Sequence, residues 1–585
     1  MLKENFDHLD YQKLYSLGRK KIAKAVDIRI AVCGDVSTQH FSCILKGLAR
    51  EMGLEFDIYE VDFGAAELEA FNPTAELYKF KPDFILILQS PFRFKEQYYH
   101  LQDKSQCSKN AHARVVALWD AFRSQSNASI IQSNFVVLNE RSAGNYSALL
   151  PQSLQHETVA LNIAIVADAK MRSSVSIADL EMLSSWVGKK FFLDEKMHGI
   201  AKIPCSLDYL PHFAQQFLDM ILTNVGRSIK CVVLDLDNTL WGGVIGDDGI
   251  DGIGLGDLDE GHAFFYMQSF MKELFNRGII LAVCSKNTES IARNVFQNHP
   301  DMVLREEHIS CFVANWDDKA ANIRKIQQTL NIGFDSMVFI DDNPFERNLV
   351  RQLLPQILVP ELPEDPSEYV RFLNELNLFE AANITSEDTT RTQSYQQQQQ
   401  RVEEQTKFVS LDDYLISLNT TATIRPFESS NISRVAQLIQ RSNQFNLTTR
   451  RYSEAECHSL ASDPASHTLT IQIKDKFGDF GLILVSILRI DKVGDQMEID
   501  SFLMSCRVLQ RGVEKLAMNE IIGYARTCGL KRLIGRYIPT AKNVMVKSFY
   551  ESFGFHLVEE CSQGHAIWAL DINDDLDFPH TIVTE

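Results

Sequence analysis

Short continuous apolar runs alternate with segments of helical period along the first two hundred residues. The runs include IRIAVCGD, FDIYEVDF, DFILILQ and LNIAIVAD. Continuous apolar strands between helices are typical of a parallel sheet that is covered on both faces. The pattern therefore predicts a doubly wound α/β domain over residues 1–220.

A second series of the same kind follows, and here each apolar strand ends in polar residues. It begins at KCVVLDLDNTLW and continues through IILAVCSKN, CFVANW and SMVFIDDNP. Ligands of open α/β sheets bind outside the carboxyl ends of the strands. We therefore predict a second α/β domain over residues 221–385, with polar residues from several strands converging on one site.

The apolar pattern stops over residues 386–410, where a run of five glutamines lies within SYQQQQQRVEE. We interpret this low-complexity stretch as a linker. Beyond it come alternating strands, HTLTIQIKD, FGLILVSILRI and QMEIDSFLMS, and then a helix, a strand and a final helix. An antiparallel meander of this kind predicts an α+β domain over residues 411–585, so that the whole chain is a multidomain α/β protein.

Composition and charge narrow the classes of function. The 585 residues include 77 acidic and 58 basic side chains, a net charge of -19 that argues against binding of nucleic acid through its phosphates. No apolar run approaches the roughly eighteen residues that span a bilayer, and the first residues lack an apolar signal region. With eleven cysteines and no CxxC pair, we expect a cytoplasmic protein with reduced thiols and no membrane association.

Two carboxylates stand at the end of the strand CVVL, Asp235 directly after it and Asp237 two residues on. Carboxylates this close repel each other unless a cation or a proton intervenes. Magnesium prefers oxygen ligands and also bridges phosphate oxygens. Such a pair alone could equally cap a turn, but polar residues also follow the next strands, namely Ser285, Lys286, Asn287, Lys319, Asp341 and Asp342.

This series of motifs resembles the haloacid-dehalogenase superfamily, in the order DLDNT, strand-end serine, lysine and acidic pair. The resemblance implies that Asp235 is the nucleophile that accepts a phosphoryl group and that Asp237 is first general acid and then base. Ser285 would bind the phosphoryl oxygens. Lys319 would offset their charge, with Lys286 as the other candidate.

The resemblance also implies a magnesium site held by Asp235, Asp237 through its backbone carbonyl, and Asp341 or Asp342. The intervals from Asp235 to Ser285 and from there to Lys319 are too short for a helical cap domain. The first interval holds the glycine-rich flap GGVIGDDGIDGIGLGDLDEG. We therefore expect a haloacid-dehalogenase-like domain without a helical cap, with a site open to a large substrate or acceptor.

Longer phrases narrow the resemblance to the FkbH-like proteins, the class IIIC haloacid-dehalogenase enzymes of polyketide pathways. They include VLDLDNTLWGGVIGDDG, AVCSKN, FIDDNPFER, SNQFNLTTRRY and MSCRVLQRGVE. This resemblance implies dephosphorylation of a phosphorylated three-carbon metabolite, 1,3-bisphosphoglycerate, and loading of its glyceryl unit onto the phosphopantetheine thiol of an acyl carrier protein. Three alternatives stay open: a magnesium-dependent phosphatase, an acyltransferase with another acceptor such as a sugar in polysaccharide synthesis, and a non-catalytic scaffold.

Two cysteines fit the role of an acyl-carrying thiol by position, Cys284 beside Ser285 and Cys506 in a loop of the C-terminal domain. Cys284 has a second interpretation, because side chains alternate along a strand and its thiol could point into the sheet.

The C-terminal domain resembles the GNAT acetyltransferases, whose loop before a helix cradles a pyrophosphate. CRVLQRGVEK aligns with that loop, although Gln510 stands where the pattern has glycine and a positive φ is costly. We expect this loop to bind the phosphopantetheine arm of a carrier, or coenzyme A, through Arg507, Arg511 and Gly512.

The N-terminal domain resembles the flavodoxin-like SGNH hydrolases through the motif GDVS, residues 34–37. In that family the nucleophilic serine follows GD directly, whereas Val36 intervenes here. Asp194 and His198 are also one residue further apart than the family's Asp-x-x-His spacing. We therefore expect this domain to serve in docking rather than in hydrolysis.

Overall fold

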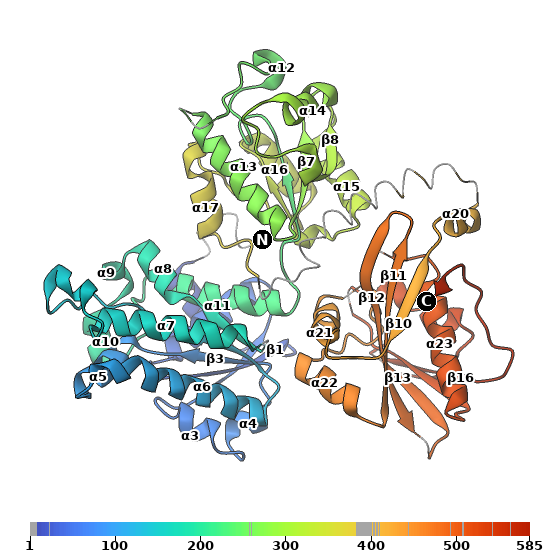
Figure 1. Ribbon diagram of the computed structural model, residues 1–585, viewed down its shortest axis with the longest axis horizontal. Coiled ribbons are helices and arrows are strands. Elements are labelled where there is room, and N and C mark those ends of the chain that lie inside the picture. The colour runs from blue at the N-terminus through green and yellow to red at the C-terminus, as the bar shows by residue number, and fades with distance from the viewer. Residues whose placement is uncertain are drawn as a thin grey trace. The chain divides into compact units, whose positions relative to one another are not determined.

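The computed structural model describes residues 9–381, apart from 23, 173, 257 and 259, and the C-terminal part of the chain from residue 410. In that part residues 443, 492, 506, 507, 541 and 562 are excepted, and residues 401, 404 and 408 are described ahead of it. The described strands form sheets of five, four and eight strands (Figure 1). One compact unit holds the N-terminal part of the chain up to Asn224, and the other holds Val225–Phe379 together with the C-terminal part. No described helix is long and apolar enough to cross a membrane.

The N-terminal sheet is entirely parallel, in the order β2-β1-β3-β4-β5. Its strands are β1 (Ile28–Gly34), β2 (Phe56–Glu60), β3 (Phe84–Leu88), β4 (Ser129–Ser133) and β5 (Val175–Ala178). The helices are α1 (Tyr11–Arg19), α2 (Gln39–Glu51), α3 (Ala66–Ala70), α4 (Glu76–Phe80), α5 (Pro91–His100), α6 (Cys107–Gln125), α7 (Leu154–Lys170), α8 (Leu180–Val187), α9 (Lys189–Phe192), α10 (Glu195–Ala201) and α11 (Leu210–Asn224).

Both faces of this sheet are covered, which confirms the predicted doubly wound fold, although the apolar run LNIAIVAD lies in helix α7 and is not a strand. Helices α6 and α7 pack on one face through residues such as Trp119 and Leu161. Helices α2 and α11 pack against each other, with the rings of Phe41 and Phe217 edge to face at 5.3 Å. Every residue of β3 is buried, as the continuous apolar run FILIL predicts.

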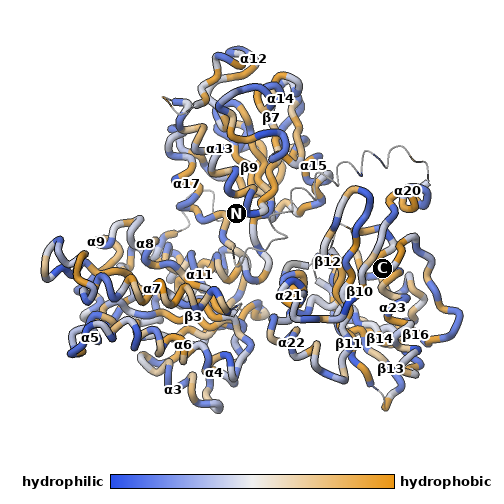
Figure 2. The backbone as a smooth tube through the Cα atoms, viewed as in Figure 1, coloured by the Kyte–Doolittle hydropathy of each residue, from blue (hydrophilic) through white to orange (hydrophobic). Residues whose placement is uncertain are grey.

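The central sheet is also parallel, in the order β8-β7-β6-β9. Its strands are β6 (Cys231–Leu234), β7 (Ile280–Ser285), β8 (Ile309–Ala314) and β9 (Met337–Ile340). Figure 2 shows the hydrophobic colour of the tube around β7 and β9. The helices are α12 (Ile245–Asp248), α13 (Gly261–Asn276), α14 (Glu289–Asn298), α15 (Lys319–Leu330), α16 (Pro344–Leu353) and α17 (Tyr369–Glu375).

Among the described residues of this domain, the segment after strand β6 is a flap and not a helical cap. Gly242 and Gly254 pair through two backbone hydrogen bonds of 2.9 and 2.8 Å, which close the flap into a loop. Asp248, the last residue of the short helix α12 in this flap, accepts the Val244 N–H through its Oδ2 at 2.7 Å. The expected domain without a cap is confirmed.

The C-terminal sheet is mostly antiparallel, in the order β15-β16-β14-β13-β12-β11-β10-β17, with β14 parallel to β13. Its strands are β10 (Thr421–Arg425), β11 (Ser466–Asp475), β12 (Gly478–Asp491), β13 (Gln496–Met504), β14 (Arg532–Tyr537), β15 (His556–Glu560), β16 (Ala566–Asp571) and β17 (Val583–Thr584). The helices are α20 (Leu411–Ser417), α21 (Ile432–Arg441), α22 (Glu454–Ser462), α23 (Val513–Thr527) and α24 (Phe549–Ser552).

The antiparallel strands, followed by helix α23 and the parallel strand β14, form the predicted α+β arrangement. The C-terminal domain, however, begins before residue 411. The Arg401 guanidinium makes two hydrogen bonds of 2.7 Å to Asp475 and lies over the Phe480 ring. Only 1% of the Arg401 side chain is exposed. Arg401 therefore belongs to the C-terminal domain rather than to a linker over 386–410, and the glutamine tract lies outside the described residues.

Candidate active site

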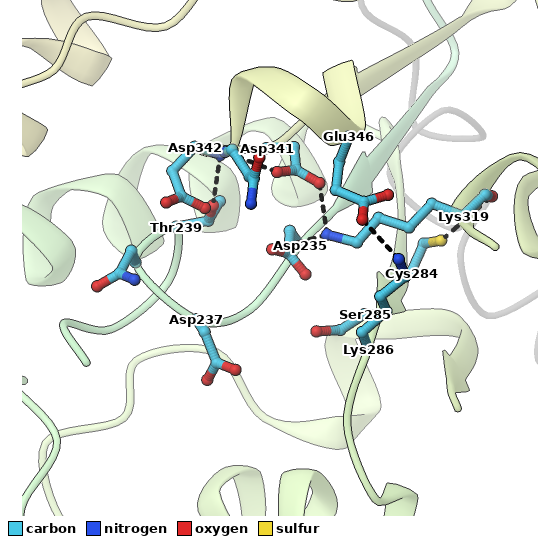
Figure 3. Close-up of polar contacts among 12 residues, drawn as sticks. Asp235, Asp237, Thr239, Cys284, Ser285, Lys286, Lys319, Asp341, Asp342 and Glu346 are labelled. Carbon is cyan, nitrogen blue, oxygen red and sulfur yellow. Dashed lines mark hydrogen bonds and ion pairs between the residues drawn. The ribbon is translucent and has the colours of Figure 1, made fainter. Parts of the chain in front are cut away.

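The polar residues at the carboxyl ends of the central strands converge, as the sequence predicts. Asp235 follows β6, Ser285 ends β7, Lys319 begins α15 after β8, and Asp341 and Asp342 follow β9. Figure 3 shows Lys319 reaching between Asp235 and Asp341, while the side chain of Asp237 lies apart from that group. The four parallel strands bring these ends to one edge of the sheet.

Lys319 is a buried cation between two buried carboxylates. Its Nζ lies 2.9 Å from Asp235 Oδ2 and 2.5 Å from Asp341 Oδ2. Burial alone would lower the pKa of Lys319, but the charges of Asp235 and Asp341 outweigh it and hold that pKa above its usual range. Burial, and then the charge of Asp235, raise the pKa of Asp341 to about 7 and that of Asp342 to about 6.

The site fits a divalent cation. Asp235, Asp341 and Asp342 each offer a carboxylate oxygen, and these three oxygens lie within 4.8 Å of one another. Oδ1 of Asp235 is buried and accepts no hydrogen bond from the described residues. Three such oxygens with a single lysine leave excess negative charge, which a hard cation such as Mg²⁺ would balance. The Asp237 side chain is not in this trio, which agrees with the expectation that Asp237 would contribute its backbone carbonyl, and that contribution stays a prediction.

Magnesium should stabilise the protein more at pH 7.5 than at pH 5. The folded-state pKa values of Asp341 and Asp342 are raised, so without metal these groups lower stability as pH rises from about 4 towards 7. Magnesium needs the ionised carboxylates, so it competes with protons at pH 5. At about 100 times its Kd, Mg²⁺ should raise Tm by about 5 °C at pH 7.5 and by clearly less at pH 5 in scanning fluorimetry.

Asp342→Asn is the control for this measurement, because it removes one ligand and one of the two titrating groups. It should lose most of the magnesium-induced rise in Tm at pH 7.5. An equal rise at both pH values in the wild-type protein would contradict the assignment of the three carboxylates as metal ligands.

The carboxylate of Asp237 is held by donors that the motif comparison did not assign. Oδ1 accepts the indole N–H of Trp241 at 2.8 Å and the backbone N–H of Ile245 at 3.1 Å. Oδ2 accepts an N–H of Asn287 at 2.9 Å, and the same amide group lies 3.1 Å from Ser285 Oγ. Asn287 thus connects the expected acid–base residue to the expected phosphoryl-binding serine.

Of the two candidate lysines for charge neutralisation, Lys319 is the one that contacts Asp235. Lys286 turns instead to Glu346, with Nζ 2.6 Å from Oε1, and 36% of its side chain is exposed. Arg347 ends the phrase FIDDNPFER, but the sequence does not reveal its role. It donates to the backbone carbonyls of Asp341 and Asp342 at 2.9 and 2.6 Å, which fixes the loop that carries both acids.

Cys284 does not fit the expected role of an acyl-carrying thiol. Its side chain is fully buried in the core on the face of the sheet that also holds Ala282, and its Sγ lies 3.7 Å from the Lys319 carbonyl oxygen. Burial raises the pKa of the Cys284 thiol well above its usual range, so the nucleophilic thiolate is disfavoured. Cys284 follows Ala282 by two residues along β7, so both side chains lie on the same face of the sheet, within the core.

Cys284→Ala should therefore leave phosphate release and acyl transfer within about threefold of the wild-type rates, since the thiol contributes packing only. The measurement is steady-state phosphate release, together with the mass of the carrier protein after reaction. Loss of acyl transfer with normal phosphate release would restore Cys284 as the acyl-carrying group.

The predicted arm-binding loop of the C-terminal domain differs from expectation at Arg511. Its side chain is buried, pairs with Asp475 at 3.0 Å and lies over the Phe480 ring, so it stabilises the domain rather than facing a ligand. Gly512 precedes α23 with φ 80°, and Gln510 adopts φ 61° although it is not glycine. Arg507 and Cys506 lie outside the described residues.

Where strands β13 and β14 separate, residues 445–447 of the same chain lie between them. The Leu447 N–H donates to the Phe502 carbonyl at 3.1 Å, and the Met504 N–H donates to the Phe445 carbonyl at 3.0 Å. On the other side, the Ile538 N–H donates to the Leu447 carbonyl at 2.9 Å. Residues 445–447 therefore cross this gap as extended chain, with Asn446 forming an isolated bridge to Leu503.

The N-terminal domain does not assemble a hydrolase triad from Ser37, Asp194 and His198. The hydroxyl of Ser37 donates to Gln39 at 2.7 Å, and Asp194 accepts the Met197 N–H at 2.9 Å as the cap of α10. The His198 ring contacts the Ile203 carbonyl at 3.2 Å and stacks on Phe92.

The chain is similar to known proteins over most of its length. The family model of the FkbH N-terminal domain matches residues 29–222. The crystal structure of the N-terminal part of the protein BF1531 from Bacteroides fragilis, containing a phosphatase domain complexed with Mg, is 36% identical. It covers 64% of this chain and 99% of its own, with a TM-score of 0.61. No curated protein matches.

Two solved acetyltransferases match the C-terminal part at low similarity. The ribosomal-protein-S18-alanine N-acetyltransferase from Escherichia coli is 18% identical and covers 27% of this chain and 100% of its own, with a TM-score of 0.21. The spermidine N-acetyltransferase from Vibrio cholerae, in complex with CoA and spermine, is 16% identical and covers 26% and 96%, with a TM-score of 0.21.

The phosphatase relative is matched over nearly its whole length, and the strand-end residues Asp235, Ser285, Lys319 and Asp341 converge in one site of the phosphoryl-transfer type. The chain is therefore an enzyme with a site of the phosphatase type, and it belongs to the FkbH-like family of the haloacid-dehalogenase superfamily.

Proposed function

We propose that this enzyme removes the phosphates of 1,3-bisphosphoglycerate and loads the glyceryl unit onto the phosphopantetheine thiol of an acyl carrier protein. The observation that carries the proposal is the cluster of Asp235, Lys319, Asp341 and Asp342 at a sheet edge bordered by a flap rather than a cap. An uncapped site suits a phosphate that is presented on a large molecule.

The two phosphates of this substrate must leave by different routes. If Asp235 took the phosphoryl group from the acyl phosphate at C1, the acyl group would depart as a free carboxylate, and no thioester could form. Instead the carrier thiol attacks the C1 carbonyl, the C–S bond forms, the C–O bond to phosphate breaks, and the thiol proton passes to solvent or to the departing phosphate. The haloacid-dehalogenase site then serves the phosphate ester at C3.

At C3, the Asp235 carboxylate attacks phosphorus and the bond between phosphorus and the C3 oxygen breaks. Asp237 gives a proton to the departing C3 oxygen. A water that loses its proton to Asp237 then attacks the aspartyl phosphate, which releases inorganic phosphate and restores Asp235. Ser285 binds the phosphoryl oxygens and Lys319 offsets their charge. A magnesium ion held by Asp235, Asp341 and Asp342 would supply further neutralisation of the phosphoryl oxygens.

The phosphopantetheine arm is part of this proposal, but its binding residues change. Arg511 is committed to Asp475 and the gap between β13 and β14 is filled, so neither is offered as the arm-binding surface. Gly512, at the start of α23, stays a candidate for a backbone contact to the arm.

The test is intact-protein mass spectrometry of a phosphopantetheinylated carrier after incubation with the enzyme, magnesium and 1,3-bisphosphoglycerate. The wild-type enzyme should give a glyceryl adduct on the carrier. Asp235→Asn should give the adduct that is heavier by one phosphate, because thiol attack at C1 does not need Asp235. Phosphate release without an acyl adduct on any carrier would contradict the transferase reaction and favour the phosphatase alternative.

A further inference from the structure

Trp241 is a buried aromatic residue whose one polar atom is directed at the acid–base residue. Its side chain is fully buried, and its indole N–H donates to Asp237 Oδ1 at 2.8 Å. The indole packs edge to face against Phe296, with ring centroids 6.1 Å apart at 75°. A ring held by such packing has little rotational freedom, so the N–H it carries is a fixed donor.

The same carboxylate is bound at two further points. The Ile245 N–H, at the start of α12 in the flap, donates to the oxygen that Trp241 also binds, at 3.1 Å. Asn287 donates to Oδ2 at 2.9 Å and lies 3.1 Å from Ser285 Oγ. Both oxygens of the Asp237 carboxylate therefore accept hydrogen bonds. The donors come from the turn after β6, from the flap and from the loop after β7.

We propose that Trp241 is a positioning residue of the phosphoryl-transfer site, which holds the Asp237 carboxylate in the orientation needed for proton transfer to and from the reacting oxygens. This inference rests on the role of Asp237 given under the proposed function. General acid–base catalysis contributes about 10² to 10⁴ to rates, and a small misplacement of the acid loses much of it. The indole N–H makes the shorter of the two hydrogen bonds to Oδ1, at 2.8 Å against 3.1 Å from Ile245, so without it Oδ1 keeps only the longer bond from the flap.

A phosphate ester with a poor leaving group depends on this geometry more than one with a good leaving group. The C3 oxygen of 3-phosphoglycerate leaves as an alkoxide unless it is protonated, whereas the p-nitrophenolate ion leaves without help. Trp241 should therefore matter more for 3-phosphoglycerate than for p-nitrophenyl phosphate. A merely structural role would lower both rates equally.

The test is Trp241→Phe in the full-length enzyme, because phenylalanine keeps an aromatic ring in the core and removes only the N–H and part of the ring. The kcat for 3-phosphoglycerate should fall about 10- to 30-fold with KM within about threefold, and the kcat/KM for p-nitrophenyl phosphate should fall less than about threefold. In an Asp237→Asn background, Trp241→Phe should cost nothing further, since it acts through that carboxylate.

Trp119→Phe is the matched control. Trp119 is also fully buried and also donates its indole N–H to a side chain, Gln132, at 3.1 Å, but it lies in the N-terminal domain. Its substitution should leave the kinetics of both substrates unchanged.

A second readout does not depend on turnover. The indole ¹H–¹⁵N resonance of Trp241, identified by its loss in Trp241→Phe, should move on Asp237→Ala, which removes the acceptor. If 3-phosphoglycerate is not hydrolysed by the wild-type enzyme, the proposed substrate fails. The cycle with Asp237→Asn is then run on the kcat for p-nitrophenyl phosphate, which includes the attack of water that Asp237 assists as base, and its lack of additivity there still supports the role of Trp241. Equal losses on both substrates, additive losses with Asp237→Asn, or an unmoved indole resonance would overturn the proposal.

Discussion

Asp235→Asn will lower the hydrolysis of phosphate esters by at least about 10³-fold, and the protein will stay folded. The amide lacks the negative charge and the nucleophilic oxygen that attack phosphorus, and it is also a poorer magnesium ligand. Stability should not fall, because Asp235, Asp341 and Asp342 crowd one site and the substitution removes one negative charge from it. Phosphate release from 3-phosphoglycerate and p-nitrophenyl phosphate measures the first effect, and thermal unfolding the second.

Asp247→Asn is the control for this variant, because Asp247 is an exposed aspartate in α12 of the flap. It should hydrolyse both esters at close to the wild-type rate. If Asp235→Asn kept more than about a tenth of wild-type activity, Asp235 would not be the phosphoryl acceptor.

Lys319→Met will destabilise the protein strongly, unlike Asp235→Asn, and it will also lower the rate. Methionine keeps the volume, but it leaves Asp235 and Asp341 facing each other without the cation that now lies 2.9 and 2.5 Å from them. Breaking a buried pair by removing one partner costs about 3 to 5 kcal/mol. Denaturant unfolding without metal should show a loss of this size, and hydrolysis should fall about 10²-fold or more.

Adding magnesium to the Lys319→Met protein distinguishes a loss of charge balance from a simple packing defect. A divalent cation near the same carboxylates should restore part of the lost stability, whereas it cannot fill a cavity. Lys325→Met, on the exposed side of the same helix α15, is the control and should change stability by less than about 0.5 kcal/mol. A metal-free Lys319→Met protein as stable as the wild type would show that Lys319 does not balance the two acids.

Which residues meet at the site follows largely from the sequence, because the strand ends carry the chemistry. In a parallel sheet the carboxyl ends of all strands share one edge, so residues directly after each strand must be neighbours. Asp235 and Asp341 directly follow β6 and β9, and Ser285 is the last residue of β7, so these three need no knowledge of loop shape. Lys319 lies five residues beyond the end of β8, so its place in the site also depends on the loop over residues 315–318. The order of the four strands then decides only which of them are adjacent.

Contacts made by loops are a different matter. The bond from Trp241 to Asp237 depends on how the turn after β6 folds back, and the bonds of Arg347 to the carbonyls of Asp341 and Asp342 depend on the first turn of α16. Neither has a periodic signature in the sequence. The tryptophan lies within the motif DLDNTLWGG, but nothing in the motif indicates where an indole N–H will point.

Two expected site residues that the geometry does not favour differ from expectation for simple physical reasons. Arg511 has the sequence context of an exposed helix start, but its partner, Asp475, is distant in the chain and lies at the end of β11. Cys284 cannot be assigned to a face from the sequence, because the direction of a side chain at the last residues of a strand depends on how the chain leaves the sheet. The structure places it in the core beneath Lys319.

The identity of the phosphoryl acceptor is the central claim, and trapping the covalent intermediate tests it most directly. The enzyme would be mixed with magnesium and 3-phosphoglycerate, quenched within milliseconds and reduced with borohydride, which converts an aspartyl phosphate into homoserine. Peptide mass spectrometry should then find homoserine at position 235 and none in Asp235→Asn. Homoserine at another aspartate, or normal phosphate release with no converted residue, would contradict the account.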